Sequence, residues 1–293
     1  MSNSLNDIKR RLSSVKQTKQ ITNAMYLLSA ARLKQEMLGM DYIISHIDAL
    51  RRSMGDILAQ NTGAALHNTY FEISPKGTRL YMSILGDKGL CGGYNSDVAM
   101  LTLEKLRETP GAEVFCFGQI GANFLKSKGI TVNKVFPGSS MHPEFSLAKE
   151  ISEDLIENYL TDRINEVYVI YTPYAQSGRQ KCVCARLLPF LYEDFSDMGH
   201  KKPDELRYEP NATDVFKGMA PFYCASLLYD MLMQSSASEN AARMESMLSA
   251  CDNADEMISE LATQLNEVRQ LTITNEITEI SAAAEARKKE RTE

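Results

Sequence analysis

The chain has 293 residues, of which 44% are hydrophobic and 24% charged, and its formal net charge is -6. This composition is ordinary for a folded globular protein, and the acidic balance gives no general affinity for nucleic acid. The six cysteines lack the density and spacing of a disulfide scaffold or a metal site. No apolar run approaches the ~18 residues of a membrane span, and the N-terminus lacks a signal-peptide core. We therefore expect a cytosolic protein, or one held at a membrane by its partners.

The N-terminal segment predicts one long helix over residues 4 to about 60, because the first 38 residues contain neither Gly nor Pro. Its apolar residues recur at helical spacing in two tracks: Leu5, Ile8, Leu12 and Val15, then Ile21, Met25 and Leu28. Thr18 and Lys19 interrupt the two tracks. The segment is basic, with seven Lys and Arg against one acid in residues 1–34.

The middle of the chain alternates between strand-like and helix-like stretches. The strand-like ones are rich in Val, Ile, Tyr and Phe and cover residues 79–85, 112–118, 166–174 and 181–190. Helix-like stretches lie near residues 94–108, 119–128 and 144–161. This alternation predicts an α/β layer with a largely parallel sheet, inserted between two terminal helices.

The C-terminal segment predicts a second long helix, since residues 222–293 contain neither Gly nor Pro. Its apolar positions step by three and four, as in a coiled-coil seam: Met244, Met247, Cys251, Ala254, Ile258, Leu261, Leu265 and Val268. Sixty helical residues span ~90 Å, which is long for the alternative, a core helix of an all-α domain. Residues 239–280 carry nine acids, so antiparallel pairing with the basic first helix buries both seams and offsets both charges.

A glycine-rich run, GDKGLCGGYN at residues 86–95, follows the first predicted strand and precedes a helix. A dinucleotide site is disfavoured because the second strand ends in Gly118–Gln119, without the acid that binds a ribose. A Walker loop is disfavoured because Tyr94 and Asn95 follow the last glycine where Lys and Ser or Thr are required.

Two interpretations of this run stay open from the residues alone. Gly89-Leu90-Cys91-Gly92-Gly93 fits a nucleophile elbow, whose base would be His142 or His200. The simpler interpretation is a structural turn at Gly89, Cys91, Gly92 and Gly93, where Cβ atoms would clash.

Four stretches carry a resemblance to a known family. Residues 8–33, IKRRLSSVKQTKQITNAMYLLSAARL, resemble the opening helix of the γ subunits of F-type ATP synthases. DKGLCGGYN (87–95) resembles the glycine-cysteine loop of that family, and YEPNATDVF (208–216) resembles its connector into the last helix. Residues 237–286 are similar to its C-terminal signature throughout. The four stretches occur in the family's order, which makes the match specific.

The resemblance implies an α/β protein in which a long antiparallel coiled coil of the N- and C-terminal helices carries an inserted Rossmann-like α/β domain. The expected segments are 1–60 for the first helix, 75–200 for the α/β domain, 210–286 for the last helix and 287–293 for a charged tail. The tail, from about residue 285, is expected to be frayed.

The implied function is that of a rotor shaft inside a ring of three α and three β subunits, coupling ion flow to ATP synthesis or hydrolysis. The ε subunit and the membrane c-ring are further implied partners; nucleic acid is not one, and the chain does not itself enter the membrane. No catalytic residue, cofactor or metal is expected. The implied location is peripheral, on the cytoplasmic face of a bacterial cell membrane.

By resemblance, Met25 and the pair Arg269–Gln270 occupy positions that touch loops of the β subunit. Asn275 stands where the family usually has Gln, so a contact there is expected to be shorter or lost. The alternative function from the residues is a cysteine-elbow α/β hydrolase with helical oligomerisation arms.

Overall fold

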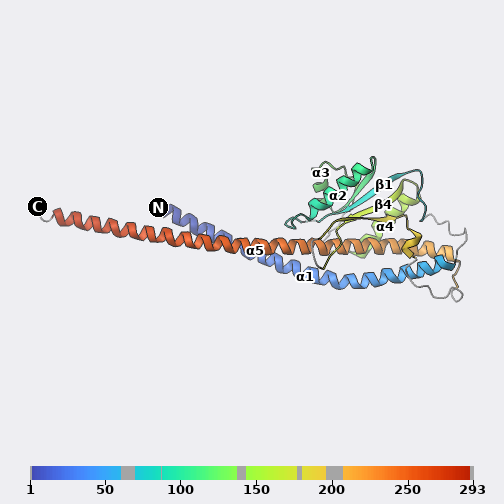
Figure 1. Cartoon of the computed structure of the whole chain (residues 1–293), viewed down its shortest axis with the longest axis horizontal. Helices are drawn as coiled ribbons and strands as arrows, with labels where there is room; N and C mark the ends of the chain where they lie inside the picture. The colour runs from blue at the N-terminus through green and yellow to red at the C-terminus, as the bar shows by residue number, and fades with distance from the viewer. Residues whose placement is uncertain are drawn as a thin grey trace. The chain divides into compact units, whose positions relative to one another are not determined.

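The computed structural model of the chain describes residues 2–60, 70–86, 88–136, 143–176, 180–195 and 207–290. It divides into two compact units, one formed by Met1–Leu28 with Met244–Glu293 and the other by Ser29–Arg243. The longest helices, α1 (Ser2–Gln60) and α5 (Ala212–Glu290), each have a part in both units (Figure 1). Among the described residues, no helix combines the length and the hydropathy that crossing a bilayer requires.

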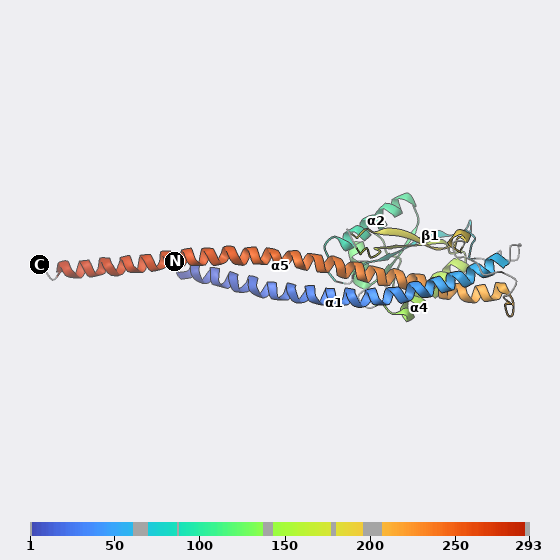
Figure 2. The same cartoon turned by 60° about the horizontal axis from the view of Figure 1, so that its bottom comes forward.

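In the first unit, α1 and α5 pair antiparallel (Figure 2). Lys19 Nζ lies 2.5 Å from Asp255 Oδ1, and one turn later in α1 Thr22 Oγ1 lies 3.1 Å from Cys251 Sγ, one turn earlier in α5. The predicted seam of α5 is confirmed, because its inner positions are the least exposed residues of this part of the helix: Met247 at 3%, Ala254 at 5%, Cys251 at 8% and Leu261 at 9%.

The predicted seam of α1 is wrong at Ile21 and Leu28, whereas Met25, the third predicted position after Val15, is half-buried. Ile21 and Leu28 are 62% and 53% exposed, whereas Lys19 and Thr22 point to α5. The reason is helical geometry: six residues beyond Val15 a side chain has rotated by about 240°, while seven residues beyond it has returned to the same face. The seam therefore keeps its three-and-four spacing and accepts polar residues.

The second unit contains a five-stranded sheet in the order β3-β2-β1-β4-β5. The strands are β1 (Thr78–Ile84), β2 (Glu113–Phe117), β3 (Lys134–Phe136), β4 (Ile164–Tyr171) and β5 (Val183–Leu188). β1 to β4 run parallel to one another, and β5 pairs antiparallel with β4. The central strand β1 is a nearly continuous buried run, as expected for a parallel strand covered on both faces.

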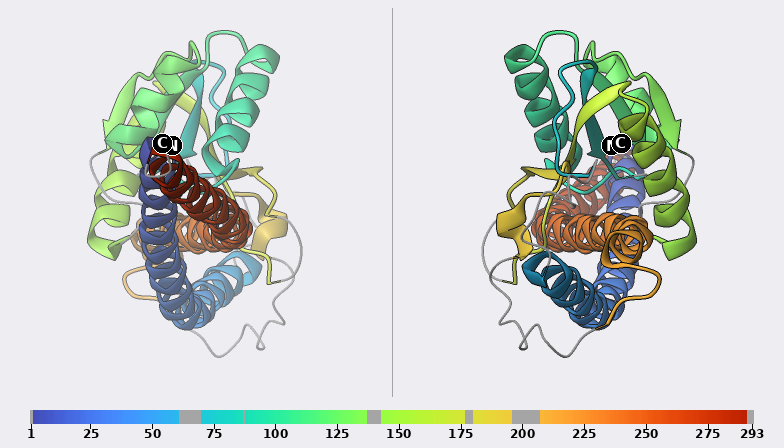
Figure 3. Two further views of the ribbon diagram at one scale, coloured as in Figure 1. Left: turned by 90° about the vertical axis from the view of Figure 1, so that its left-hand side faces the viewer. Right: turned by 90° about the vertical axis from the view of Figure 1, so that its right-hand side faces the viewer.

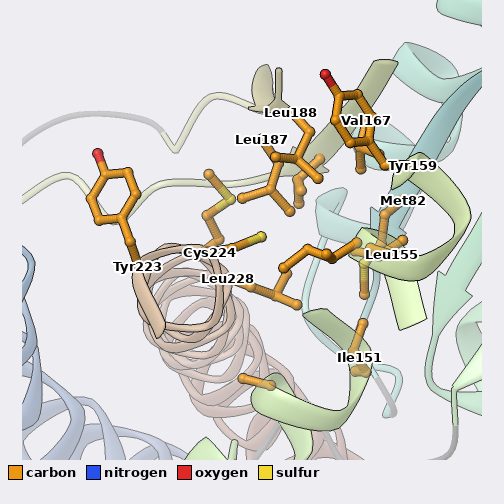
Figure 4. Packing of buried hydrophobic residues seen from close by; sticks show 14 of the residues in the cluster. Met82, Ile151, Leu155, Tyr159, Val167, Leu187, Leu188, Tyr223, Cys224 and Leu228 are labelled. Carbon is orange, nitrogen blue, oxygen red and sulfur yellow. The ribbon is translucent and has the colours of Figure 1, made fainter. Parts of the chain in front are cut away.

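Helices cover both faces of this sheet (Figure 3). On one face α2 (Tyr94–Glu108) and α3 (Gln119–Ser127) enclose a small apolar cluster with Tyr81, Val114 and Cys116. On the other, α4 (Phe145–Leu160) and the α1 and α5 segments of this unit enclose a larger one. Figure 4 shows part of it, with side chains of α5, α4 and the strands meeting: Tyr223, Cys224, Leu228, Ile151, Leu155, Tyr159, Met82, Val167, Leu187 and Leu188.

The predicted α/β class, with its terminal helices paired and a sheet inserted between them, is confirmed. The sequence missed β3, which has three residues, and the short 3-10 helix η2 (Tyr192–Phe195). α5 begins at Ala212, tolerates Pro221 near its start, and keeps helical backbone to Glu290. The expected fraying from about residue 285 stays a prediction, although Ala, Glu, Arg and Lys favour helix there; residues 291–293 lie outside the described ones. The segment boundaries expected from the sequence stay a prediction.

Candidate functional site: the glycine-rich loop and the helix segment beside it

The glycine-rich loop joins β1 to α2 at the carboxyl edge of the sheet. Leu90 and Gly92 have positive φ values of 64° and 59°, and the N–H of Tyr94 donates to the carbonyl of Cys91 at 3.3 Å. Gly93, with a φ of -83°, stands at the N-cap of α2. These residues turn the chain from the strand into the helix within a few positions; Asp87 lies outside the described residues.

The glycines of the loop differ in what surrounds them. A Cβ on Gly89 would meet nothing within 4 Å, and one on Gly93 would meet Asp97 at an ordinary 3.7 Å. A Cβ on Gly86 would lie 2.6 Å from Cδ of Glu239, well inside van der Waals contact. The clash of Cβ atoms expected at Gly89 and Gly93 is therefore wrong. Glycine is favoured at position 92 by its backbone conformation and at position 86 by the close approach of α5.

Cys91 is buried at 3% exposure, and its Sγ donates to the carbonyl of Lys88 at 3.6 Å. Burial, followed by the charge of Glu239, raises the pKa of the Cys91 thiol. A nucleophilic cysteine needs the opposite, an accessible thiolate with a lowered pKa. His142 and His200, the bases that the elbow interpretation requires, lie outside the described residues.

The strand order reverses at β1, which in doubly wound sheets creates a ligand crevice at the carboxyl ends of the strands. In this chain the residues Ser235 to Arg243 of α5 contact that edge. Tyr94 Oη donates to the carbonyl of Ser235 at 3.1 Å, Glu239 lies against Gly86, and Arg243 Nη2 donates to the carbonyl of Lys88 at 3.3 Å. The carboxylate of Glu239 thus lies against Gly86, which is the second residue after the end of β1.

A buried polar cluster extends from this contact to α1; its members are Glu36, Ser236, Glu239, Asn240 and Arg243. Asn240 Nδ2 donates to both carboxylate oxygens of Glu36, at 3.0 and 3.1 Å, and Ser236 Oγ donates to Oε1. Arg243 forms an ion pair with Glu239 and donates to Asn240 Oδ1 at 3.3 Å. Each member is less than a tenth exposed, so α1 and α5 meet here through buried polar and charged side chains.

Burial raises the pKa of Glu36 above its ordinary value of 4.5. Hydrogen bonds from Ser236 and Asn240 oppose this rise, the charge of Glu239 adds to it, and the charge of Arg32 opposes it. The desolvation of the carboxylate is the largest effect, as expected for an acid enclosed between two helices.

The residues expected to contact a β subunit all lie in the first unit. Met25 is half-buried on α1, while Arg269, Gln270 and Asn275 lie on exposed faces of α5. Cys251, which faces Thr22, precedes Arg269 by about five helical turns. The structure therefore does not bring Met25 together with the other three residues, because they lie at different distances along the paired helices.

Sequence reasoning missed Glu36, Glu239 and Arg243 because charged residues in a long helix usually face water. One signal was available: Glu36 continues the three-and-four spacing of Ser29 and Leu33, both of which are buried. For a metal, the described ranges offer no group of three or more His, Cys, Asp or Glu side chains suitably placed.

Comparison with known proteins places these features in a family. A sequence profile described as ATP synthase matches residues 4–286. The ATP synthase gamma chain of Caldicellulosiruptor saccharolyticus is 35% identical over 98% of this chain and 100% of its own length. The gamma chain of Acetobacterium woodii, named as sodium ion specific, is 33% identical over 98% and 99%.

Solved structures show the same fold at lower identity. A chain of the Euglena gracilis mitochondrial ATP synthase, in a structure of OSCP, F1 and the c-ring, matches with a TM-score of 0.66 and 16% identity over 98% of this chain and 95% of its own length. A chain from the central stalk and c-ring of the Tetrahymena thermophila enzyme gives 0.57 and 22% over 78% and 99%. The paired terminal helices, the inserted sheet and the full-length similarity together assign this chain to the ATP synthase family, among its gamma chains.

Proposed function

We propose that this chain is the central rotor shaft of an F-type ATP synthase. It couples rotation of an ion-driven c-ring to conformational change in the ring of three α and three β subunits, and so to ATP synthesis or hydrolysis. The observation that carries this proposal is the antiparallel pairing of the two chain ends along one seam, Lys19 with Asp255 and Thr22 with Cys251, in a chain similar to gamma chains over its whole length. A shaft needs length and a continuous seam.

The proposed partners are the α and β subunits, the ε subunit and the c-ring. Support comes from the related structures, which combine a similar chain with F1 and the c-ring in Euglena gracilis and with the c-ring in Tetrahymena thermophila. Met25, Arg269, Gln270 and Asn275 are the proposed contacts to β-subunit loops. Three of the four are exposed on α5, which leaves them accessible to another subunit.

The chain contributes no catalytic group of its own in this role. The buried, protonated thiol of Cys91 and the carboxylate of Glu239 beside Gly86 support this, because the first is unsuited to attack and the second lies where a doubly wound sheet binds a nucleotide's phosphates. The proposed location is peripheral, on the cytoplasmic face of a bacterial membrane.

Reconstitution tests the proposal. The purified chain alone should neither bind nor hydrolyse ATP, and adding it to α and β subunits should yield a cooperative ATPase that a covalent link between the chain and β arrests. ATP turnover by the isolated chain, or full ATPase activity in the cross-linked complex, would contradict a rotor.

A further inference from the structure

The segment of α5 from Ser235 to Arg243 is seated in a receptor built by the glycine-rich loop. We call this receptor the glycine socket and define it by Gly86, the carbonyl of Lys88 and the hydroxyl of Tyr94. Glu239 fills it against Gly86, Arg243 binds the Lys88 carbonyl, and Tyr94 binds the Ser235 carbonyl. All of these residues belong to one compact unit.

A side chain at Gly86 would fit only if the carboxylate of Glu239 moved. The three carboxylate atoms of Glu239 would lie between 2.6 and 2.9 Å from a Cβ at Gly86. Glu239 is 1% exposed and Arg243 3%, and they form an ion pair across one helical turn. A buried ion pair is costly to break because either partner alone would be left charged and desolvated. The pair therefore holds one geometry.

Away from the socket, the described part of the contact between α5 and the sheet is mostly apolar. The main contact uses apolar and thiol side chains such as Cys224 and Leu228 (Figure 4), whose attraction depends on buried area and hardly on direction. Hydrogen bonds and ion pairs depend on angle and distance. The socket is thus suited to fix how far α5 is rotated about its own axis.

α1 is fixed at the same level. Glu36 accepts hydrogen bonds from Ser236 and Asn240 of α5, and Asn240 in turn accepts one from Arg243. Both helices and the loop are therefore joined through one connected set of polar groups. α5 continues past Arg243 into the first unit without interruption.

We propose that the glycine socket transmits torque: it locks the rotational setting of α5 on the α/β domain, with Glu239 and Arg243 as positioning residues for coupling. This inference rests on the rotor function proposed above. It assigns to the glycine-rich loop a mechanical task carried by Gly86 and the Lys88 carbonyl, at the edge where related folds hold a phosphate.

The test compares Gly86→Ala with Gly89→Ala in the reconstituted holoenzyme in liposomes. The two variants make the same chemical change in the same loop, but at Gly86 the new methyl meets Glu239 and at Gly89 it meets nothing. The readout is the number of ions pumped per ATP hydrolysed. We expect about a two- to tenfold fall for Gly86→Ala and the parent ratio for Gly89→Ala.

Rescue separates the lock from a general packing defect. In Gly86→Ala/Glu239→Asp the carboxylate is withdrawn by one methylene while Arg243 keeps a partner, so the pumping ratio should return toward that of the parent. If Gly86→Ala does not assemble, Arg243→Lys serves instead, because it keeps the charge beside Glu239 and loses the guanidinium fork that reaches Lys88 and Asn240. It too should lower the ratio while ATP hydrolysis continues.

A parent-like ratio in assembled Gly86→Ala, or in Arg243→Lys where that variant is the one tested, would overturn the socket's role. So would an equal fall in both glycine variants, or a double variant that assembles without recovering. If the rotor function itself were wrong, the result would differ. Ion pumping by the parent enzyme and by Gly89→Ala would then be the same whether or not this chain is present.

Discussion

Glu36 is an acid enclosed between two helices, where an ordinary seam would place an aliphatic side chain. Its carboxylate keeps hydrogen bonds from Asn240 at 3.0 and 3.1 Å, which recover part of the hydration that burial removes. Satisfied polar groups of this kind specify one arrangement, while a missing partner leaves the full desolvation penalty.

The pH dependence of stability should report this burial. The pKa of Glu36 is raised above 4.5 by burial, so the folded chain binds the proton more tightly than the unfolded chain. The contribution of Glu36 to the free energy of unfolding is therefore fully present below about pH 4.5. It is lost as the pH rises through the higher pKa of the folded chain. Glu36→Gln stays neutral, so its free energy of unfolding, relative to the parent, should rise between about pH 4 and about pH 7 in urea titrations.

Glu245→Gln, an exposed change on α5, is the matched control and should follow the parent at every pH. A difference between Glu36→Gln and the parent that stays constant over this range would show that the carboxyl titrates alike in the folded and unfolded chains. The charges facing Glu36 come from both helices, with Glu239 raising its pKa and Arg32 lowering it.

Substituting a buried and an exposed leucine of α5 tests which face of the helix is paired. Leu261 is 9% exposed and Leu271 is 62% exposed, so Leu261→Ala should lower the free energy of unfolding by roughly 2 to 3 kcal/mol. Leu271→Ala should change it by less than about 0.5 kcal/mol. Denaturant unfolding followed by circular dichroism measures both, and equal losses would mean that α5 is not paired along the proposed face.

At the scale of elements, the sequence predicted most of the sheet and its helices because β1, β2 and β4 are five to eight residues long and rich in apolar side chains. β3, with three residues, is too short for periodicity to detect. The antiparallel direction of β5 was also beyond prediction, because the composition of one strand does not settle the direction in which it pairs.

The same limit applies to the paired helices. The seam of α5 was predictable since its inner positions are apolar, whereas that of α1 continues through Lys19 and Thr22. Exposed Ile21 and Leu28 misled the pattern, because hydrophobicity was taken as the marker of the inner face. Helix phase from the preceding Leu12 and Val15 is the better guide.

The pairing of α1 with α5 can be tested by a cross-link. Thr22 Oγ1 lies 3.1 Å from Cys251 Sγ, so a thiol at position 22 needs only a small shift to reach the ~2.05 Å of a disulfide. Thr22→Cys should form that bond under mild oxidation, detected as the linked peptide by mass spectrometry.

Asn23→Cys is the control for this cross-link. It is exposed and lies about 100° further round the helix, so it should not link to Cys251. The bond at position 22 should also disappear when Cys251→Ser is added. A cross-link that forms equally well from positions 22 and 23 would contradict the observed pairing.

At the scale of the whole molecule, the fold was predictable from local patterns, and the role of the chain from resemblance along its length. What neither supplied was the contact of Glu239 and Arg243 with the glycine-rich loop, or that of Glu36 with α5 beside it. Glu36 lies some 200 residues before Glu239 and Arg243 in the sequence, and each of the three resembles a surface charge. Only the fold brings them together, since it places the end of β1 beside α5.

Arg269→Ala should lower the coupled activity of the assembled complex without changing the stability of the purified chain. Arg269 is exposed on α5, so its loss should leave the melting temperature of the purified chain within error. If it contacts a β-subunit loop, ATP hydrolysis coupled to ion pumping should fall in the reconstituted enzyme.

Lys126→Ala, which removes an exposed cation from α3, is the comparison for Arg269→Ala and should affect neither measurement. Coupled activity equal to that of the parent in Arg269→Ala would remove this residue from the proposed contacts, without bearing on the shaft itself.

The polar positions in the seam of α1 have a consequence for how the chain finds its native alignment. If α5 slid along α1 by one heptad, Glu36 would face Met233 or Met247 where Asn240 now lies, and its carboxylate would lose its donors. Such a mismatch costs several kcal/mol in a buried setting. Glu36 and Asn240, which lie 204 residues apart in the sequence, therefore allow only one lengthwise alignment of the two helices.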